Sequence, residues 1–390
     1  MKKDREFGIV VYGATGYTGK LVVEYLNNQY GANGEVSWAI AGRSLEKLEA
    51  LRTDLGIAAG LPMIVADASE PATLIAMVKR AAVVITTVGP YQLYGSDLVA
   101  ACAAAGTDYV DLCGEPTWMQ AMINAHSAAA AASGARIVFS CGFDSIPFDL
   151  GVLYLQAAAQ EAFGAALPRI RGRVRAMKGV WSGGTLASFK VTMAAAAKDP
   201  ALGAALIDPF ALTPGFTGPD QPSGSKPLYD ELLASWVAPF VMAIVNTKTI
   251  HRSNFLLDHR YGTDFVYDEM LLTGPGDKGE AVAKAVAADK SMATDTTQPG
   301  DGPTKEQRET GMYDLLFVGE AVDGRTIRAS VQGDMDPGYG STSKMIAESA
   351  VCLLKNPEAA AGGIWTPAAA LGPLLIDRLQ RNAGLTFRME

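Results

Sequence analysis

The chain has 390 residues, of which 49% are hydrophobic and 19% charged, a composition that supports a folded core and argues against intrinsic disorder. With 33 basic and 41 acidic residues the net charge is −8, so no overall positive field would attract nucleic acids. The chain has three histidines and no HExxH motif, so we expect no metal site. Its four cysteines have no CxxC spacing, which predicts free thiols and a location in the cytoplasm. The length predicts two domains.

The longest apolar segment, residues 232–245, is too short for a transmembrane helix, which needs about 20 apolar residues. We expect a buried helix or the wall of a pocket. The alternative is an apolar surface that meets a lipidic substrate or makes peripheral contact with a membrane.

The first 150 residues alternate short apolar runs with helical patterns, which predicts a doubly wound α/β domain with a parallel sheet. Helices are expected at 18–28, 45–55, 70–79, 95–105 and 117–133, the last one ending in an alanine run before Gly134. Strands are expected at 8–12, 36–41, 62–65, 82–88, 109–112 and 136–140.

Residues 151–390 do not alternate in this way and predict an α+β domain built on an antiparallel sheet. A helix is expected at 151–163, an extended segment at 169–177, and a helix from about Gly184. Residues 312–321 and 325–332 have the pattern of an antiparallel hairpin. Two last helices, near 343–354 and 367–381, are expected to pack back on the first domain.

The strongest local signal is a glycine-rich stretch between the first strand and the first helix. Glycine there lets backbone N–H groups approach a pyrophosphate at the helix N-terminus, and this strand–helix context favours a dinucleotide site over a simple turn. The residues expected to contact the cofactor are Gly13, Ala14, Thr15, Gly16, Tyr17, Thr18 and Gly19.

The end of the second strand indicates which dinucleotide binds. NAD-dependent enzymes place an acidic residue there for the ribose hydroxyl, whereas this strand ends in Arg43 and Ser44. A guanidinium and a hydroxyl suit a 2′-phosphate, so NADP(H) is predicted; the alternative is a solvated arginine. Asp67, after the third strand, would contact the adenine edge or only cap the next helix.

The ends of the later strands should meet the nicotinamide, because ligands bind beyond the carboxyl ends of a doubly wound sheet. After the fourth strand the expected residues are Val88, Gly89, Pro90 and Tyr91, and after the fifth they are Cys113 and Gly114. Cys113 and Cys141 could approach one another, although small buried thiols are the commoner outcome.

Three side chains at these strand ends are candidates for moving a proton. Tyr91 is the first candidate for donating the proton or orienting the substrate. An equal alternative is that the Tyr91 ring is only a packed aromatic side chain that covers the cofactor. Glu115 and Asp144 would supply or relay protons, or cap the helices that follow them. Capping is favoured for Asp144, and the role of Glu115 is left open.

Several motifs together carry a family resemblance: GATGYTG, AGRS, VGPYQLYGSDLVAACAAAGTDYVDLCGE, CGFDSIPFDLG, GGTLAS, PFVMAIVNTKTIHRSN and GGIWTPAAALG. The chain resembles the saccharopine dehydrogenase-like oxidoreductases, and most closely their trans-acting enoyl reductase branch.

The resemblance implies an NADP(H)-binding Rossmann domain and a second domain that forms the substrate cleft. It also implies reduction of an activated C=C bond in an apolar polyketide or lipid precursor. The alternatives are a saccharopine-type imine reductase acting on an amino acid, and a non-catalytic NADP-binding protein associated with lipid. By analogy of fold, the second domain would also form a homodimer interface.

Arginines alternate along the extended segment, at Arg169, Arg171, Arg173 and Arg175, which places them on one face of a strand. The simpler expectation is a solvated edge strand that discourages aggregation. The alternative is an anion site for a phosphopantetheine arm, a coenzyme A moiety or an acidic carrier protein.

Overall fold

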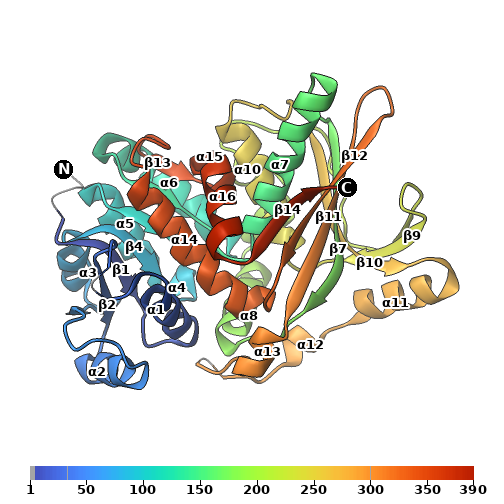
Figure 1. Ribbon diagram of the computed structural model, residues 1–390. Helices are drawn as coiled ribbons and strands as arrows, with labels where there is room; N and C mark the ends of the chain where they lie inside the picture. Colours follow the sequence, from blue (N-terminus) through green and yellow to red (C-terminus); the bar gives the residue numbers. More distant parts are fainter. Residues whose placement is uncertain (1–4, 33, 299) are drawn as a thin grey trace.

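Seven parallel strands form the first sheet of the protein, whose computed structural model describes residues 5–32, 34–298 and 300–390. The strands are β1 (Phe7–Tyr12), β2 (Trp38–Gly42), β3 (Met63–Val65), β4 (Ala81–Thr86), β5 (Asp108–Val110), β6 (Arg136–Val138) and β13 (Gly363–Trp365). Their order is β13-β6-β5-β4-β1-β2-β3, on the left of Figure 1. The predicted α/β domain is therefore confirmed, and one strand from the end of the chain extends its sheet.

Helices cover both faces of this sheet, which explains why all six residues of β4 are buried. These helices are α1 (Tyr17–Tyr30), α2 (Leu45–Asp54), α3 (Pro71–Val78), α4 (Tyr91–Tyr94), α5 (Ser96–Ala105), α6 (Pro116–Ser133) and α14 (Thr342–Lys355). The alanine run closes α6, and Gly134 follows it with a φ of +80°, as a glycine helix stop requires. Helix α14 packs on α1, β4 and β5.

The second sheet is mostly antiparallel, as predicted. Its strands are β7 (Arg169–Lys178), β8 (Leu228–Asp230), β9 (Ser235–Pro239), β10 (Val266–Gly274), β11 (Met312–Glu320), β12 (Thr326–Gly333) and β14 (Leu385–Met389). They lie in the order β14-β12-β11-β7-β10-β9-β8, and only the β7–β10 pair is parallel. The expected hairpin is confirmed as β11 and β12.

The remaining helices surround this sheet and the space between the two sheets (Figure 1). They are α7 (Ile146–Phe163), α8 (Gly183–Lys198), α9 (Pro200–Ile207), α10 (Ala243–Leu256), α11 (Gly276–Ala288), α12 (Ser291–Thr294), α13 (Lys305–Glu309), α15 (Pro367–Ala370) and α16 (Gly372–Asn382), with a π-helical turn at Pro337–Ser341. Within the described ranges, no helix has both the length and the apolar character needed to cross a bilayer.

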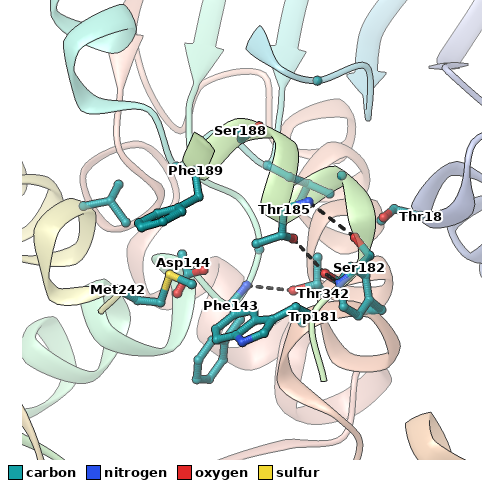
Figure 2. A pocket seen from close by; sticks show the side chains of 18 of the residues that line it. Thr18, Phe143, Asp144, Trp181, Ser182, Thr185, Ser188, Phe189, Met242 and Thr342 are labelled. Atoms are coloured by element: carbon teal, nitrogen blue, oxygen red, sulfur yellow. Dashed lines mark hydrogen bonds between the residues drawn. The ribbon is translucent and has the colours of Figure 1, made fainter. Parts of the chain in front are cut away.

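The apolar segment 232–245 is not the single helix that we considered. It contains β9, a turn and the start of α10, because the strand pairing ends at Pro239 and a turn at 241–242 precedes the helix. The alternative expectation, a pocket wall, holds for its last part: Phe240, Val241, Met242, Ile244 and Val245 line a cavity (Figure 2).

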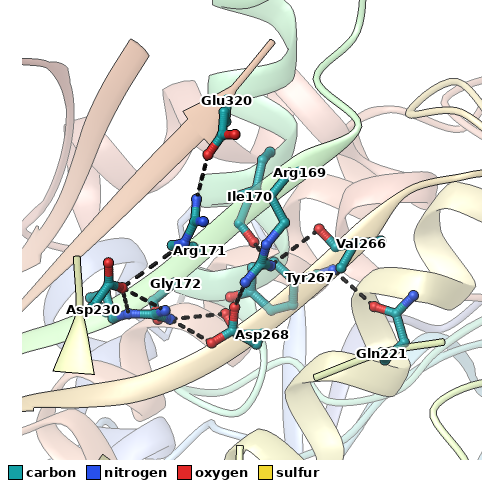
Figure 3. A network of polar contacts seen from close by, with 11 residues as sticks. Arg169, Ile170, Arg171, Gly172, Gln221, Asp230, Val266, Tyr267, Asp268 and Glu320 are labelled. Carbon is teal, nitrogen blue, oxygen red and sulfur yellow. Dashed lines mark hydrogen bonds and ion pairs between the residues drawn. The ribbon is translucent and has the colours of Figure 1, made fainter. Parts of the chain in front are cut away.

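The arginine strand is β7, the central strand of the second sheet, so the expectation of an edge strand is wrong. Its arginines face carboxylates contributed by other strands of the same sheet and by the end of the chain, as Figure 3 shows for part of the network. The pairs are Arg169–Asp268, Arg171–Glu320, Arg173–Asp230, Arg173–Asp268, Arg175–Asp314 and Arg175–Glu390. Because each guanidinium is already paired, the structure gives no support to an anion site there.

The most buried member of this network should contribute strongly to stability. The Arg173 side chain is 2% exposed and reaches Asp230 at 2.9 Å and Asp268 at 2.8 Å. We expect Arg173→Leu to lower the free energy of unfolding by about 3–5 kcal/mol, because it leaves two buried carboxylates without their shared cation. Urea-induced unfolding followed by circular dichroism measures the change.

The matched control is Lys284→Ala, which removes an exposed i,i+4 pair with Glu280. It should change the free energy of unfolding by no more than about 0.5 kcal/mol. Equal losses for the two variants would contradict the structural role assigned to the buried network.

Candidate cofactor and substrate site

One cavity of about 380 Å³ lies where the carboxyl ends of the first sheet meet the second half of the chain. From the first half it is lined by the glycine loop, by the turn after β4, and by residues after β5 and β6. Ligands of doubly wound sheets bind at this edge. Among the cofactor residues expected from the sequence, those that line the cavity are Gly16, Tyr17, Thr18, Gly89, Tyr91 and Gly114.

The three glycines of the loop have different physical tasks. Gly13 has a φ of +85°, and a Cβ there would lie 2.7 Å from Val88 Cγ2. A Cβ on Gly19 would lie 2.1 Å from the Gly13 carbonyl oxygen, so this glycine lets α1 pack on the loop. A Cβ on Gly16 would meet only that same oxygen, at 3.3 Å, and would otherwise point into open space.

The loop therefore fits a dinucleotide. Gly16 is the N-cap residue of α1, no side chain caps this helix, and its first turn holds no acidic residue. An uncapped helix N-terminus with a bare backbone in front of it suits a pyrophosphate. Ala14 and Thr15 complete the loop, and Ala14 is fixed by a hydrogen bond from its N–H to the Ala41 carbonyl, at 3.2 Å.

Tyr17 connects the glycine loop to the second half of the chain, which the sequence did not indicate. Its hydroxyl donates to the Pro303 carbonyl and accepts from Arg308 Nη1 at 3.0 Å. Its ring meets the Tyr339 ring edge-on, with centroids 5.3 Å apart. The two halves of the chain thus touch directly beside the expected phosphate position.

The residues expected to select the cofactor lie outside the cavity, beyond the ends of β2 and β3. Arg43 is exposed, and Ser44 caps α2 by accepting from the Lys47 N–H at 3.3 Å. Asp67 accepts from the N–H and the hydroxyl of Ser69, which lower its pKa, and the nearby Arg43 charge adds to this effect. Asp67 thus shapes the turn before α3 and lies near Arg43.

Tyr91 is held by backbone groups at the end of the sheet. Its hydroxyl donates to the Thr86 carbonyl at 3.2 Å and accepts from the Leu112 N–H at 3.0 Å. Burial raises the pKa of Tyr91 well above its ordinary value, and its ring packs near Trp118 at 5.6 Å. These contacts match the alternative of a packed aromatic that forms one wall of the cavity.

Glu115 fixes the turn before Tyr91 and does not point at a substrate. Its two carboxylate oxygens accept from the N–H groups of Tyr91 and Gln92, each at 2.9 Å, and so cap the short helix α4. Next to it, Cys113 is fully buried, which raises its pKa well above the ordinary value. All four cysteines are free, as expected.

Asp144 does not cap a helix, so the capping role favoured from the sequence is wrong. Ser145 occupies the N-cap position of α7, and Asp144 Oδ1 is buried without any hydrogen-bond partner. The side chain borders the cavity beside Phe143 (Figure 2). Loss of hydration raises the pKa of Asp144 to about 7, so the group can hold a proton near neutral pH.

The rest of the wall comes from the second half of the chain and is mostly apolar. The large apolar side chains that line the cavity are Leu112, Phe143, Met177, Val180, Trp181, Phe189, Met193, Leu206, Phe240, Val241, Met242, Ile244, Val245 and Met292. Among the described residues of the lining, Asp144 alone carries an acidic or basic side chain.

Hydrogen bonds join the walls of the cavity, and the sequence pointed to only some of the residues that make them. Tyr339 accepts from the Ser182 N–H at 2.6 Å and lies 2.7 Å from Thr185 Oγ1, while Thr342 accepts from the Phe143 N–H at 2.8 Å (Figure 2). Thr185 lies in the GGTLAS motif at 183–188 and Phe143 in the CGFDSIPFDLG motif, whereas no sequence signal pointed to Ser182, Tyr339 or Thr342.

Comparison with known proteins agrees with this geometry. Residues 9–138 match the family described as the saccharopine dehydrogenase NADP binding domain, so the cofactor is NADP(H). A Mycobacterium tuberculosis protein with the provisional name trans-acting enoyl reductase is 41% identical over 403 residues, covering 96% of each chain. The trans-acting enoyl reductase of Mycobacterium bovis is 38% identical over 406 residues, again covering 96% of each.

Among solved structures, the apo saccharopine dehydrogenase (L-Glu forming) of Saccharomyces cerevisiae has the same fold, with a TM-score of 0.54 at 10% identity. The match covers 98% of this chain and all of the yeast chain (100%). The chain belongs to the saccharopine dehydrogenase-like oxidoreductases, in the group that contains the trans-acting enoyl reductases.

Proposed function

We propose that this NADP(H)-dependent oxidoreductase reduces an activated carbon–carbon double bond in an apolar, polyketide- or lipid-type substrate. The names of the relatives at 38–41% identity support this reaction. The observation that carries it is the cavity lining, which is apolar and holds a single ionisable group of acidic or basic type, Asp144, within the described residues.

The lining argues against an amino-acid substrate. Recognition of a substrate carboxylate calls for a guanidinium, an ammonium or a free helix N-terminus within hydrogen-bond distance. Two helix N-termini border the cavity: that of α1 faces the expected pyrophosphate, and that of α8 is capped by Ser182, whose hydroxyl accepts from the Thr185 N–H at 3.4 Å. No arginine, lysine or histidine of the described chain lines the cavity, and the arginines of β7 are paired with carboxylates. An imine formed from an amino acid would therefore lose the hydration of its carboxylate and gain no cation in exchange.

Bound NADPH supplies the hydride for such a reduction. The protein must then deliver one proton to the other carbon, and Asp144 is the side chain placed for this because its carboxyl borders the cavity and holds a proton up to a pH of about 7. The hydroxyl of Tyr91 is engaged by Thr86 and Leu112, so Tyr91 shapes the wall. Glu115 holds the turn that presents Tyr91.

Arg43 and Ser44 are proposed to bind the 2′-phosphate of the cofactor. Arg43 is exposed and directly follows β2. The Asp67 carboxylate lies near it, so the phosphate must approach Arg43 from the side away from Asp67. The Ser44 hydroxyl accepts from Lys47 and still has its own hydrogen to donate to a phosphate oxygen.

The reaction can be tested by following NADPH oxidation with two probes. The first is a long-chain α,β-unsaturated acyl thioester of N-acetylcysteamine, and the second is an imine formed from an α-amino acid and an aldehyde. We expect turnover with the thioester alone. Turnover of the imine alone would contradict the proposal, and NADPH binding without turnover of either probe would favour a non-catalytic protein.

Asp144→Asn should lower kcat for the thioester about 100-fold at pH 6, because the amide cannot give up a proton to the product carbon. In the wild type, activity that depends on neutral Asp144 should be full well below pH 7 and fall as the pH rises through about 7, the folded pKa of Asp144. Stopped-flow measurement of hydride transfer gives both quantities. An unchanged kcat together with unchanged NADPH affinity would exclude Asp144 as the donor.

Arg43→Ala should weaken NADPH binding about 10–100-fold, which corresponds to the loss of charge-assisted hydrogen bonds to one phosphate. Binding of NADH, which lacks this phosphate, should change little. Isothermal titration calorimetry with both nucleotides measures the difference in affinity. The control is Arg52→Ala, because Arg52 lies in the same region but donates to the Ala59 carbonyl. Equal affinities of Arg43→Ala and wild type for NADPH would refute the assignment.

A further inference from the structure

One face of α8 brings three hydroxyl groups to the cavity. Thr185, Ser188 and Thr192 are spaced three and four residues apart, so they lie on the same side of the helix, and all three line the cavity. Ser188 is the last residue of the GGTLAS motif, and Figure 2 shows it on α8 at the edge of the cavity. The proposed function has so far given this motif no chemical task.

Most hydroxyl groups of the described lining already take part in a hydrogen bond within the protein. They belong to Tyr17, Thr87, Tyr91, Ser182, Thr185, Thr192, Tyr339 and Thr342. The other two lining hydroxyls are those of Thr18 and Ser188. Thr18 belongs to the glycine loop and lies in the first turn of α1, beside the expected pyrophosphate. Outside that loop, Ser188 therefore has the one hydroxyl of the described lining that no protein group engages.

The two neighbouring hydroxyls hold this face of α8 in place. One turn before Ser188, Thr185 Oγ1 lies 2.7 Å from the Tyr339 hydroxyl. One turn after it, Thr192 Oγ1 accepts from Gln92 Nε2 at 3.0 Å, which ties α8 to the short helix α4. The Ser188 hydroxyl is thus carried on a fixed element and remains free to bind a ligand.

The Ser188 hydroxyl also lies at the place where the reacting groups are expected. A Cβ on Gly89 would lie 3.7 Å from Ser188 Oγ. Because Gly89 has no side chain, the space next to this hydroxyl stays open above the turn that follows β4. Ligands of doubly wound sheets bind beyond such strand ends, and this turn is the expected neighbour of the nicotinamide.

The proposed reduction develops a negative charge on an oxygen atom of the substrate. Addition of the hydride to the β-carbon of an α,β-unsaturated thioester moves the C=C electron pair into the bond between the α-carbon and the carbonyl carbon, and the carbonyl electron pair moves onto oxygen. Protonation of the α-carbon by Asp144 then restores the carbonyl, so one hydride and one proton are consumed. The described lining holds no arginine, lysine or histidine, so this oxygen needs a neutral hydrogen-bond donor.

We infer that Ser188 is a catalytic residue that donates a hydrogen bond to the carbonyl oxygen of the substrate and stabilises the negative charge that develops there. This role rests on the proposed function. It also narrows the substrate class, because the double bond must be conjugated with a carbonyl group. The carboxamide oxygen of the nicotinamide is an acceptor of the same chemistry, and the experiments below distinguish the two acceptors.

Ser188→Ala should lower kcat for the thioester probe about 100-fold and leave the affinity for NADPH unchanged, because the hydrogen bond strengthens as the oxygen becomes negative. Ser188→Thr, which keeps a hydroxyl, should retain most of the rate. Stopped-flow measurement of hydride transfer and isothermal titration calorimetry with NADPH give the two quantities. An unchanged kcat in Ser188→Ala, or a loss of NADPH affinity without a loss of kcat, would overturn the inference.

A loss of rate in Ser188→Ala should not come from a loss of stability. The substitution removes no hydrogen bond found among the described residues, and alanine favours a helix more than serine does, so the free energy of unfolding should not fall. The matched control is Val191→Ala, which shortens a side chain of α8 outside the cavity lining and should leave kcat unchanged. Equal losses of kcat in the two variants would show a general disturbance of α8 and would overturn the specific role of Ser188.

The contact can also be observed without turnover. The thioester probe, labelled with ¹³C at its carbonyl carbon, is bound together with NADP⁺, which has no hydride to transfer, and its carbonyl stretch is recorded by infrared difference spectroscopy. The stretch should lie at lower wavenumber in the wild type and in Ser188→Thr than in Ser188→Ala, because a hydrogen bond polarises the carbonyl. Equal wavenumbers would overturn the inference. If the wild type does not reduce the thioester, the proposed function fails, and the infrared comparison alone decides whether Ser188 binds the carbonyl.

Discussion

The alignment of the parallel strands in the first sheet is the constraint on which the site depends. Tyr12 pairs with Thr86, Ile85 with Val110, and Val110 with Val138, so β1, β4, β5 and β6 end at one edge. Each end is followed by a glycine that lines the cavity: Gly16, Gly89, Gly114 and Gly142. Bare backbone at four adjacent strand ends creates a surface that a flat dinucleotide can approach closely.

The second half of the chain closes this edge with apolar side chains, mostly from helices and loops, and its paired charges lie in the second sheet, outside the cavity lining. The arginines of β7 and their carboxylate partners lie on one face of the sheet, and each pair satisfies its charge locally. As a consequence, large apolar side chains from α8 and from the turn before α10 line the cavity. The net charge of −8 for the whole chain therefore does not describe the charge at the site. The local distribution of charge determines which ligands can enter.

The sequence predicted those parts of the site that short stretches of chain encode. The glycine loop, the Gly-Pro-Tyr turn after β4 and the absence of an acidic residue at the end of β2 depend on a few consecutive residues, and the predicted NADP(H) follows from them. The alternation of arginines correctly placed them on one face of a strand. Whether that strand lies at the edge or in the centre depends on pairing with residues up to about position 320, which no local pattern contains.

Long-range packing also explains the other errors. Asp144 has the sequence context of a helix cap, but Ser145 takes the N-cap position of α7, and the carboxyl is left facing the cavity. The short strand β13 joins β6 from the far end of the chain, with too few residues to give a strand pattern of its own. The sequence pointed to two parts of the wall, residues 183–188 and 232–245, but only the folded chain reveals that they surround one space together with Tyr339 and Thr342.

Within the described residues no arginine, lysine or histidine lines the cavity, and this connects the proposed substrate to the proposed chemistry. In a low-dielectric space without a positive charge, a carboxyl group is more stable with its proton than without it, which is why burial alone raises the pKa of Asp144. The same absence makes the cavity unfavourable for an anionic substrate and leaves it suited to a neutral, apolar one. A cation placed in the wall for substrate recognition would also lower the pKa of Asp144 and ionise it. In the proposed reaction, selection of a neutral substrate and retention of the Asp144 proton are therefore two results of one electrostatic condition.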